Sequence, residues 1–180
     1  MACKSMQYVA KKRNKNRGEM DSDFTVFFEI EGEPVAKGRA RKGLTKTGKT
    51  VVYTPAKTAN YETVGAFQAR QAMKYAGYST PWDGPLVVIA LVERGIPKSW
   101  SKKKKEEARS GAIRPTSRPD LDNYLKIILD SCNGIVFGDD SQIVEIAAGK
   151  IYGDHPRVMV KFSGLVPHGT FFERFYSDDD

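Results

Sequence analysis

The sequence predicts a single α+β domain with a short tail at each end. Its 180 residues are within the usual size of one domain. Segments with the period of strands and a segment with a clear helical period occur without the regular alternation of a doubly wound fold. We expect a mixed or antiparallel sheet packed with about two or three helices. The expected boundaries are a basic tail over 1–22, the domain over 23–165 and a second tail over 166–180.

The composition is globular, with an excess of positive charge. It is 40% hydrophobic and 28% charged, and the formal net charge is +7. This charge points to an anionic partner, most commonly nucleic acid. The longest apolar run, residues 86–92, is far shorter than the roughly 20 residues that cross a bilayer, so we expect no membrane span. Two distant cysteines, Cys3 and Cys132, favour a reducing cytoplasm.

The domain begins with a strand and a basic hairpin. Apolar residues alternate from Phe24 to Ile30, which is the period of a half-buried strand. In the basic segment that follows, Gly43 and Gly48 mark a hairpin whose second strand is "TVVYT". We expect its positive side chains to bind DNA phosphates: Lys37, Arg39, Arg41, Lys42, Lys46, Lys49 and Lys57.

The middle of the chain predicts two helices and a strand. Residues 59–75 lack proline and are rich in helix formers. The run "LVVIALV" (86–92) predicts a strand buried on both faces. A polar segment then favours a helix capped at Ser99 or Ser101 and ending at Gly111.

The clearest helical period lies between Leu121 and Cys132, with Asn133 and Gly134 as its exit. This helix should begin at the aspartates of "PDLDN". We expect "GIVF" to follow as a strand, Gly138–Asp140 as a tight turn, and "SQIVEIAAGKIYG" as the antiparallel partner of "GIVF". The alternating segment "PRVMVKFSGL" predicts the last strand.

Carboxylates gather around this helix. If the chain is extended at its start, Asp120 and Asp122 project to the same side. Two converging carboxylates repel unless a proton or cation lies between them. Lys126 is on the same helical face as Asp122. A "GIVF" strand that returns along the helix could place Asp139 or Asp140 beside the first pair.

Such a cluster has a catalytic and a structural interpretation. Three carboxylates without histidine or thiolate suit Mg²⁺ or Mn²⁺. A bound metal next to a lysine and basic loops is what phosphodiester cleavage requires. Alternatively the acids only cap a helix and a turn, and the protein is a noncatalytic DNA-binding recombination accessory protein. Other metal nucleases fit less well, because the chain has no HNH-type histidine set and no acid-x-lysine pair after Asp120.

The segment "RPDLDNYLKIILDSCNGIVFGDDSQI" (118–143) resembles the core signature of the RusA-type Holliday-junction resolvases. "GEPVAKGRARKG" and "YTPAKTANYE" resemble other family segments, and "IPKSWSKKKKEEA" resembles one of phage-type members. The resemblance implies a RusA-like fold and a crossover junction endodeoxyribonuclease acting in recombination and repair. It also implies a homodimer that cuts four-way or branched DNA by paired, symmetric cleavage, in the host cytoplasm if the protein is phage-encoded.

The resemblance assigns roles to individual residues. It makes Asp120, Asp122 and Asp140 the metal-binding catalytic acids, with Asp139 in support, and Lys126 the catalytic lysine. Two further positions match the family: Asn123 would orient the cluster, and Lys150 is at a frequently basic position. One departure is Ala40, where the family often has proline. The remaining acid of the segment, Asp130, is expected to be only a surface residue.

Overall fold

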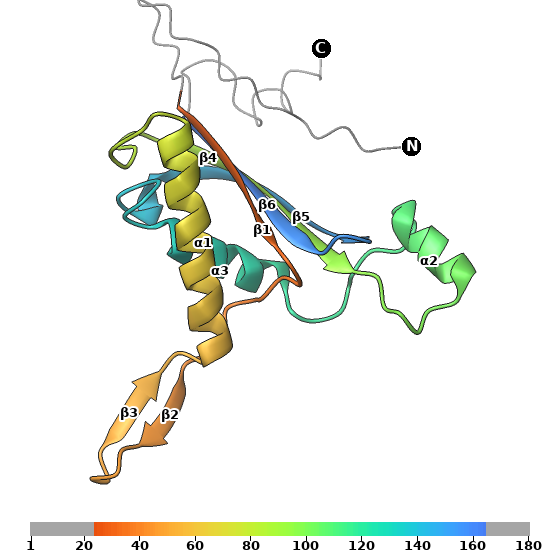
Figure 1. Cartoon of the computed structure of the whole chain (residues 1–180), viewed down its shortest axis with the longest axis horizontal. Coiled ribbons are helices and arrows are strands. Elements are labelled where there is room, and N and C mark those ends of the chain that lie inside the picture. The colour runs from red at the N-terminus through yellow and green to blue at the C-terminus, as the bar shows by residue number, and fades with distance from the viewer. Residues whose placement is uncertain (1–23, 165–180) are drawn as a thin grey trace, which may run out of the picture.

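The computed structural model describes residues 24–164. Their core is a four-stranded sheet with two helices, α1 (Ala56–Tyr75) and α3 (Leu121–Cys132), on one face. A small hairpin projects from one end of α1, and a short helix, α2 (Lys102–Arg109), lies beyond the end of the sheet (Figure 1). The predicted α+β class is confirmed. The expected tails, 1–22 and 166–180, lie outside the described residues, and the domain boundaries stay a prediction.

The sheet has the strand order β1-β6-β4-β5. Strand β6 (Arg157–Gly164) lies antiparallel between β1 (Thr25–Glu31) and β4 (Leu86–Gly95). Strand β5 (Ile143–Gly153) pairs with β4 in parallel and forms one edge. The antiparallel pairing expected for β5 is therefore wrong. A parallel pair needs a long crossover, and the chain supplies it through α2 and α3.

The expected "GIVF" strand is also wrong. Residues 134–137 form tight turns against the end of α3: Gly134 donates its N–H to the carbonyl of Phe137 (2.8 Å), and Ile135 donates to Cys132 (3.0 Å). Val136 and Phe137 are fully buried. The apolar run thus reflects burial beneath the helix end rather than pairing in the sheet.

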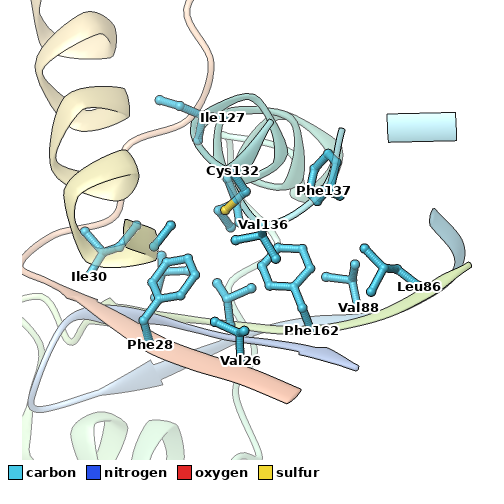
Figure 2. Packing of buried hydrophobic residues seen from close by; sticks show 14 of the residues in the cluster. Val26, Phe28, Ile30, Leu86, Val88, Ile127, Cys132, Val136, Phe137 and Phe162 are labelled. Carbon is cyan, nitrogen blue, oxygen red and sulfur yellow. The ribbon is translucent and has the colours of Figure 1, made fainter. Parts of the chain in front are cut away.

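The core lies between the sheet and the two helices. In Figure 2, Val26, Phe28 and Phe162 point from the strands toward α3 and its following turn, which contribute Cys132 and Val136. The prediction that alternate residues of β1 face the core is confirmed. Strand β4 differs from its prediction: Val88 is fully buried, but its neighbour Ile89 is 49% exposed. Helices α1 and α3 both lie on the core side of the sheet, so neither covers Ile89 (Figure 1).

Both flanking helices form where expected. Helix α1 starts slightly earlier than predicted and approaches α3 closely at Gly65, where an added Cβ would lie 2.8 Å from Ser131 Oγ. Helix α2 is capped by Ser101, whose hydroxyl accepts from the N–H of Lys104 at 3.3 Å. Within the described residues, no helix combines the length and the apolar character needed to span a membrane.

The predicted hairpin is confirmed as strands β2 (Arg41–Leu44) and β3 (Thr50–Tyr53), which we call the ribbon. It stands away from the sheet and leads directly into α1 (Figure 1). Almost all of its residues are exposed. Its fold therefore depends on its own ladder and turn, and its position depends on its two connections to the domain.

Candidate active site

The N-terminus of α3 presents two carboxylates to solvent. Asp120 is the N-cap residue, with an extended backbone (φ −75°, ψ 154°), and Asp122 lies in the first helical turn. Both residues are exposed. The side chain of Asp120 makes no capping hydrogen bond. The structural interpretation needs such a bond, so the position of Asp120 leaves its carboxylate free for another partner.

Lys126 follows Asp122 by about one helical turn and is exposed on the same face. Among residues 24–164 it makes neither an ion pair nor a side-chain hydrogen bond. Asn123 is its neighbour in this turn, and its amide nitrogen lies 3.4 Å from Asp122 Oδ1. Within the described residues, the first turn of α3 thus combines an acid without a side-chain partner, Asp120, an acid that contacts only its neighbour Asn123, and the unengaged ammonium of Lys126.

The loop that leads into α3 is fixed by the sheet. Lys150 on β5 donates from Nζ to the carbonyl of Pro119 (3.0 Å) and, at 3.4 Å, to that of Ser117. Arg94 near the end of β4 donates to the Ser117 hydroxyl and to the carbonyl of Arg118, both at 3.3 Å. The Arg118–Pro119 peptide bond is cis. Residues from two strands therefore hold the backbone immediately before Asp120.

These contacts give Lys150 a structural role and reveal a residue that the sequence interpretation missed. Arg94 follows the apolar part of β4 and also lies 3.6 Å from Glu33. An arginine and a glutamate directly after a buried apolar run were the available signal, because charged groups near a core usually have partners. The partner in the loop before α3 is far away in sequence and could not be inferred.

Asp139 and Asp140 lie at the other end of α3. They begin a short 3-10 turn, η1 (Asp140–Gln142), whose Gln142 donates from Nε2 to the carbonyl of Trp82 at 2.9 Å. Trp82 in turn donates its N–H to Val136, beside the helix C-terminus. Helix α3 has 12 residues, or about 18 Å of length. The expectation that these acids lie beside Asp120 and Asp122 is therefore wrong within one chain, because residues 134–137 do not return along the helix.

The two adjacent acids also differ from each other. Asp139 Oδ1 accepts the N–H of Ser141 at 2.9 Å, and the N–H of Asp139 donates to Gln142 Oε1 at 3.0 Å, which completes a capping box. The hydrogen bonds from Ser141 lower the pKa of the Asp139 carboxyl. Asp140 is exposed and its carboxylate has no hydrogen-bond or ion-pair partner within the described part of the chain. Asp139 thus serves the turn, whereas Asp140 is unengaged.

The fit of these residues to a metal ion is partial. In residues 24–164, no group of three or more His, Cys, Asp or Glu side chains is close enough to hold a metal ion. Asp120 and Asp122 nevertheless provide hard oxygen ligands. Magnesium commonly takes one or two protein carboxylates and completes its octahedron with water and substrate phosphate oxygens. The pair at α3 fits this mode of binding.

The positive residues expected to bind DNA divide into two groups. Lys37 is engaged within the fold: its Nζ lies 2.5 Å from Glu62 Oε1 on α1 and 2.6 Å from Asp130 Oδ2 on α3. Desolvation lowers the pKa of Lys37, but the bonds to Asp130 and Glu62 outweigh it and raise the pKa overall. This corrects the expectation of a free phosphate contact at Lys37 and that of a purely superficial Asp130. The other six residues are exposed on or beside the ribbon: Arg39, Arg41, Lys42, Lys46, Lys49 and Lys57.

The base of the ribbon is joined to the site. The N–H of Lys37 donates to the carbonyl of Asn123 at 2.8 Å, and that of Gly38 donates to Thr58 Oγ1 at 3.3 Å. The chain enters the ribbon directly afterwards. The exposed basic side chains therefore begin next to the helical turn that carries Asp122, and the sequence from 34 to 61 contains no acidic residue.

Comparison with known proteins identifies the family of this chain. Residues 31–163 match the model of the family described as endodeoxyribonuclease RusA, and the chain belongs to this family. It is also similar to YqaN of Bacillus subtilis (strain 168), described as an uncharacterized protein. The two are 42% identical over 137 residues, which cover 75% of this chain and 93% of the relative.

Proposed function

We propose that the protein is a divalent-metal-dependent endodeoxyribonuclease that resolves Holliday junctions and related branched DNA by paired, symmetric cleavage. The observation that carries this proposal is the first turn of α3. There Asp120 and Asp122 are free of capping bonds, Lys126 is unpaired among the described residues, and a loop anchored by two strands fixes the backbone. Membership of the RusA family supports phosphodiester cleavage as its chemistry.

Each group in this turn has a chemical task in the proposed reaction. A Mg²⁺ or Mn²⁺ ion held by Asp120 and Asp122 would supply an activated water and offset charge on the phosphoryl group. Lys126 would donate to a phosphoryl or leaving oxygen as negative charge develops there. Lys150 and Arg94 would hold the loop so that Asp120 keeps its position when DNA binds.

The exposed positive residues have a separate task. The DNA that reaches the first turn of α3 would also pass the start of the ribbon. Its backbone phosphates would contact Arg39, Arg41 and Lys42 there. Such contacts supply affinity and register rather than sequence recognition. In this proposal the acidic side chains bind the metal and the basic side chains bind the DNA. The excess of positive charge on the protein then reflects its negatively charged substrate.

We further propose that the active form is a homodimer and that Asp140 acts from the second chain. One chain holds Asp140 at the far end of α3 from Asp120, yet its carboxylate is exposed and unengaged in the described structure. In a two-fold dimer, Asp140 of one chain could lie beside Asp120 and Asp122 of the other chain. The same symmetry then forms a second, equivalent site. Two equivalent sites would match the two-fold symmetry of a four-way junction.

A cleavage assay with matched substrates tests the proposal. The full chain is incubated with a labelled four-way junction or a linear duplex of the same sequence, in Mg²⁺, Mn²⁺ or Ca²⁺. We expect paired nicks in the junction with Mg²⁺ and Mn²⁺, and an intact duplex. Binding without cleavage in all three metals would favour the noncatalytic DNA-binding accessory protein. Equal cutting of the duplex would contradict structure selectivity.

A further inference from the structure

The ribbon exposes apolar side chains that belong to no core. Leu44 is 75% exposed and Val52 is 65% exposed. The register pairs Lys42 with Val52 and Leu44 with Thr50, so these four side chains share one face of the ribbon. Leu44 and Val52 are diagonal neighbours on that face. Because exposed apolar neighbours on a projecting element stabilise nothing in the isolated chain, they indicate a binding surface.

The opposite face of the ribbon is different. There Tyr53 lies across Gly43: a Cβ added to Gly43 would come within 3.2 Å of Tyr53 Cε1. The tyrosine ring therefore covers the backbone of the neighbouring strand. The apolar side chains of this opposite face, Val51 (41% exposed) and Tyr53 (48% exposed), are less exposed than Leu44 and Val52, whose face is therefore the more open apolar side of the ribbon.

Positive charge surrounds this open face. Lys42 shares it, and Arg41, Lys46 and Lys49 lie on the same hairpin. No acidic residue occurs from 34 to 61. A basic two-stranded ribbon has the width and charge to enter the major groove of DNA. The face of Leu44 and Val52 thus fits a ligand that is both negatively charged and partly apolar. DNA has both properties, in its phosphates and in the faces of its bases.

We propose that Leu44 and Val52 insert against unstacked bases at the branch point of the DNA. The proposal rests on the proposed function and adds a means of recognising branched substrates. In a linear duplex each base face is covered by its neighbour, whereas at a branch point base faces at the ends of the arms become available. Apolar side chains inserted at a base step recover the stacking lost there.

The attachment of the ribbon supports this role. Lys37 and Gly38, just before the ribbon, are hydrogen-bonded to Asn123 and Thr58. Leu44 is then at most roughly 23 Å of extended chain beyond Lys37. If the ribbon binds the branch point, a nearby DNA strand would consequently lie at the first turn of α3, where Asp122 is located.

A pair of double variants of the full chain tests the proposal. Leu44→Thr/Val52→Thr removes the apolar surface but keeps β-branched residues that suit strands, and it changes no charge. Leu44→Met/Val52→Ile keeps the apolar surface and is the control. Binding is measured without divalent metal, on a four-way junction with 2-aminopurine at the branch point and on a linear duplex of matched sequence.

We expect the threonine variant to lose at least about 10-fold in junction affinity and to lose the fluorescence increase of the unstacked base, while its duplex affinity stays unchanged. The Met/Ile variant should behave as the wild type. The inference would be overturned if the threonine variant kept the wild-type preference for the junction. It would also be overturned if the variant lost affinity equally for the junction and the duplex. If wild-type protein showed no junction preference at all, the proposed function itself would fail.

A second copy of the chain is the competing occupant. Light scattering without DNA distinguishes these two occupants, DNA and a second copy. It measures the molar mass of the wild type and of both variants. An unchanged mass supports DNA as the occupant. A dimeric wild type that becomes monomeric only in the threonine variant would identify the face as an interface between copies, and it would overturn the inference.

Discussion

The ammonium of Lys37 lies 2.6 Å from the carboxylate of Asp130 on α3, and it also contacts Glu62 on α1. Lys37 lies shortly before the ribbon, so its contacts with Asp130 and Glu62 join the base of the ribbon to the two helices on the sheet. Its partners are only partly buried. We therefore expect the pair to contribute little to the free energy of unfolding, but to fix the position of Lys37 relative to the helices.

The first prediction concerns this ion pair. Lys37→Met should lower the free energy of unfolding by about 1 kcal/mol, since the pair is partly screened by solvent. Asp130→Asn should cost less, because Lys37 keeps Glu62. Urea denaturation of both single variants and the double variant gives the coupling energy. A coupling energy of zero would show that the pair contributes nothing to stability.

The same pair gives a pH dependence. The pKa of Lys37 is raised in the folded state, so its contribution is fully present below the unfolded pKa near 10.4. It is lost as the pH rises through the folded value. The difference in stability between wild type and Lys37→Met should stay constant from about pH 7 to 9 and shrink above about pH 10.5. A difference that grows with pH would contradict this assignment.

The second prediction separates binding from catalysis. Asp122→Asn should retain junction affinity within about 3-fold, because binding depends on Lys and Arg contacts. Its cleavage rate should fall by about 100-fold or more, as expected when a charge-stabilising ligand is lost. Gel-shift and single-turnover cleavage assays measure the two quantities. Cleavage at a near-normal rate would refute Asp122 as a catalytic acid.

The third prediction concerns the ribbon charges. Replacing Arg39 and Arg41 by alanine should weaken binding and lower the slope of log affinity against log salt by about 2, one unit for each lost phosphate contact. Thermal unfolding should be unchanged, because both side chains are exposed. Lys74→Ala, on the last turn of α1, is a matched control. An unaltered salt slope would exclude the two arginines as phosphate contacts.

The fourth prediction concerns the loop before α3. Lys150→Met removes the bonds to Pro119 and Ser117 and should reduce the single-turnover cleavage rate about 10-fold with little change in DNA affinity, because it acts only on the position of Asp120. Lys150→Arg should restore much of the rate. If affinity fell as much as the rate, Lys150 would be a DNA contact instead.

Local sequence patterns predicted most of the elements. The alternation from Phe24 to Ile30, the serine cap of α2 and the helical period after Asp120 all rest on contacts between near neighbours. Gly48, with its positive φ of 78°, marked the turn of the ribbon correctly. Such features are determined within a few residues and can be inferred without the tertiary fold.

The failures share a physical cause. Whether Val136 and Phe137 pair in a sheet or pack under a helix end depends on which surfaces are free in the folded chain, and both situations favour an apolar run. The direction of β5 depends on its partner β4, far away in sequence. The position of Asp140 was inferred from that wrong path, and the ion pair of Lys37 depends on two helices meeting.

The most direct test of the account mixes two inactive variants. Asp122→Asn and Asp140→Asn chains are each assayed alone and then after co-refolding to exchange subunits, on a labelled four-way junction with Mg²⁺. If Asp140 acts from the second chain, a mixed dimer contains one intact site, and nicking should return to up to about a quarter of the wild-type level. A mixture as inactive as its components, beside an active co-refolded wild type, would contradict the shared site.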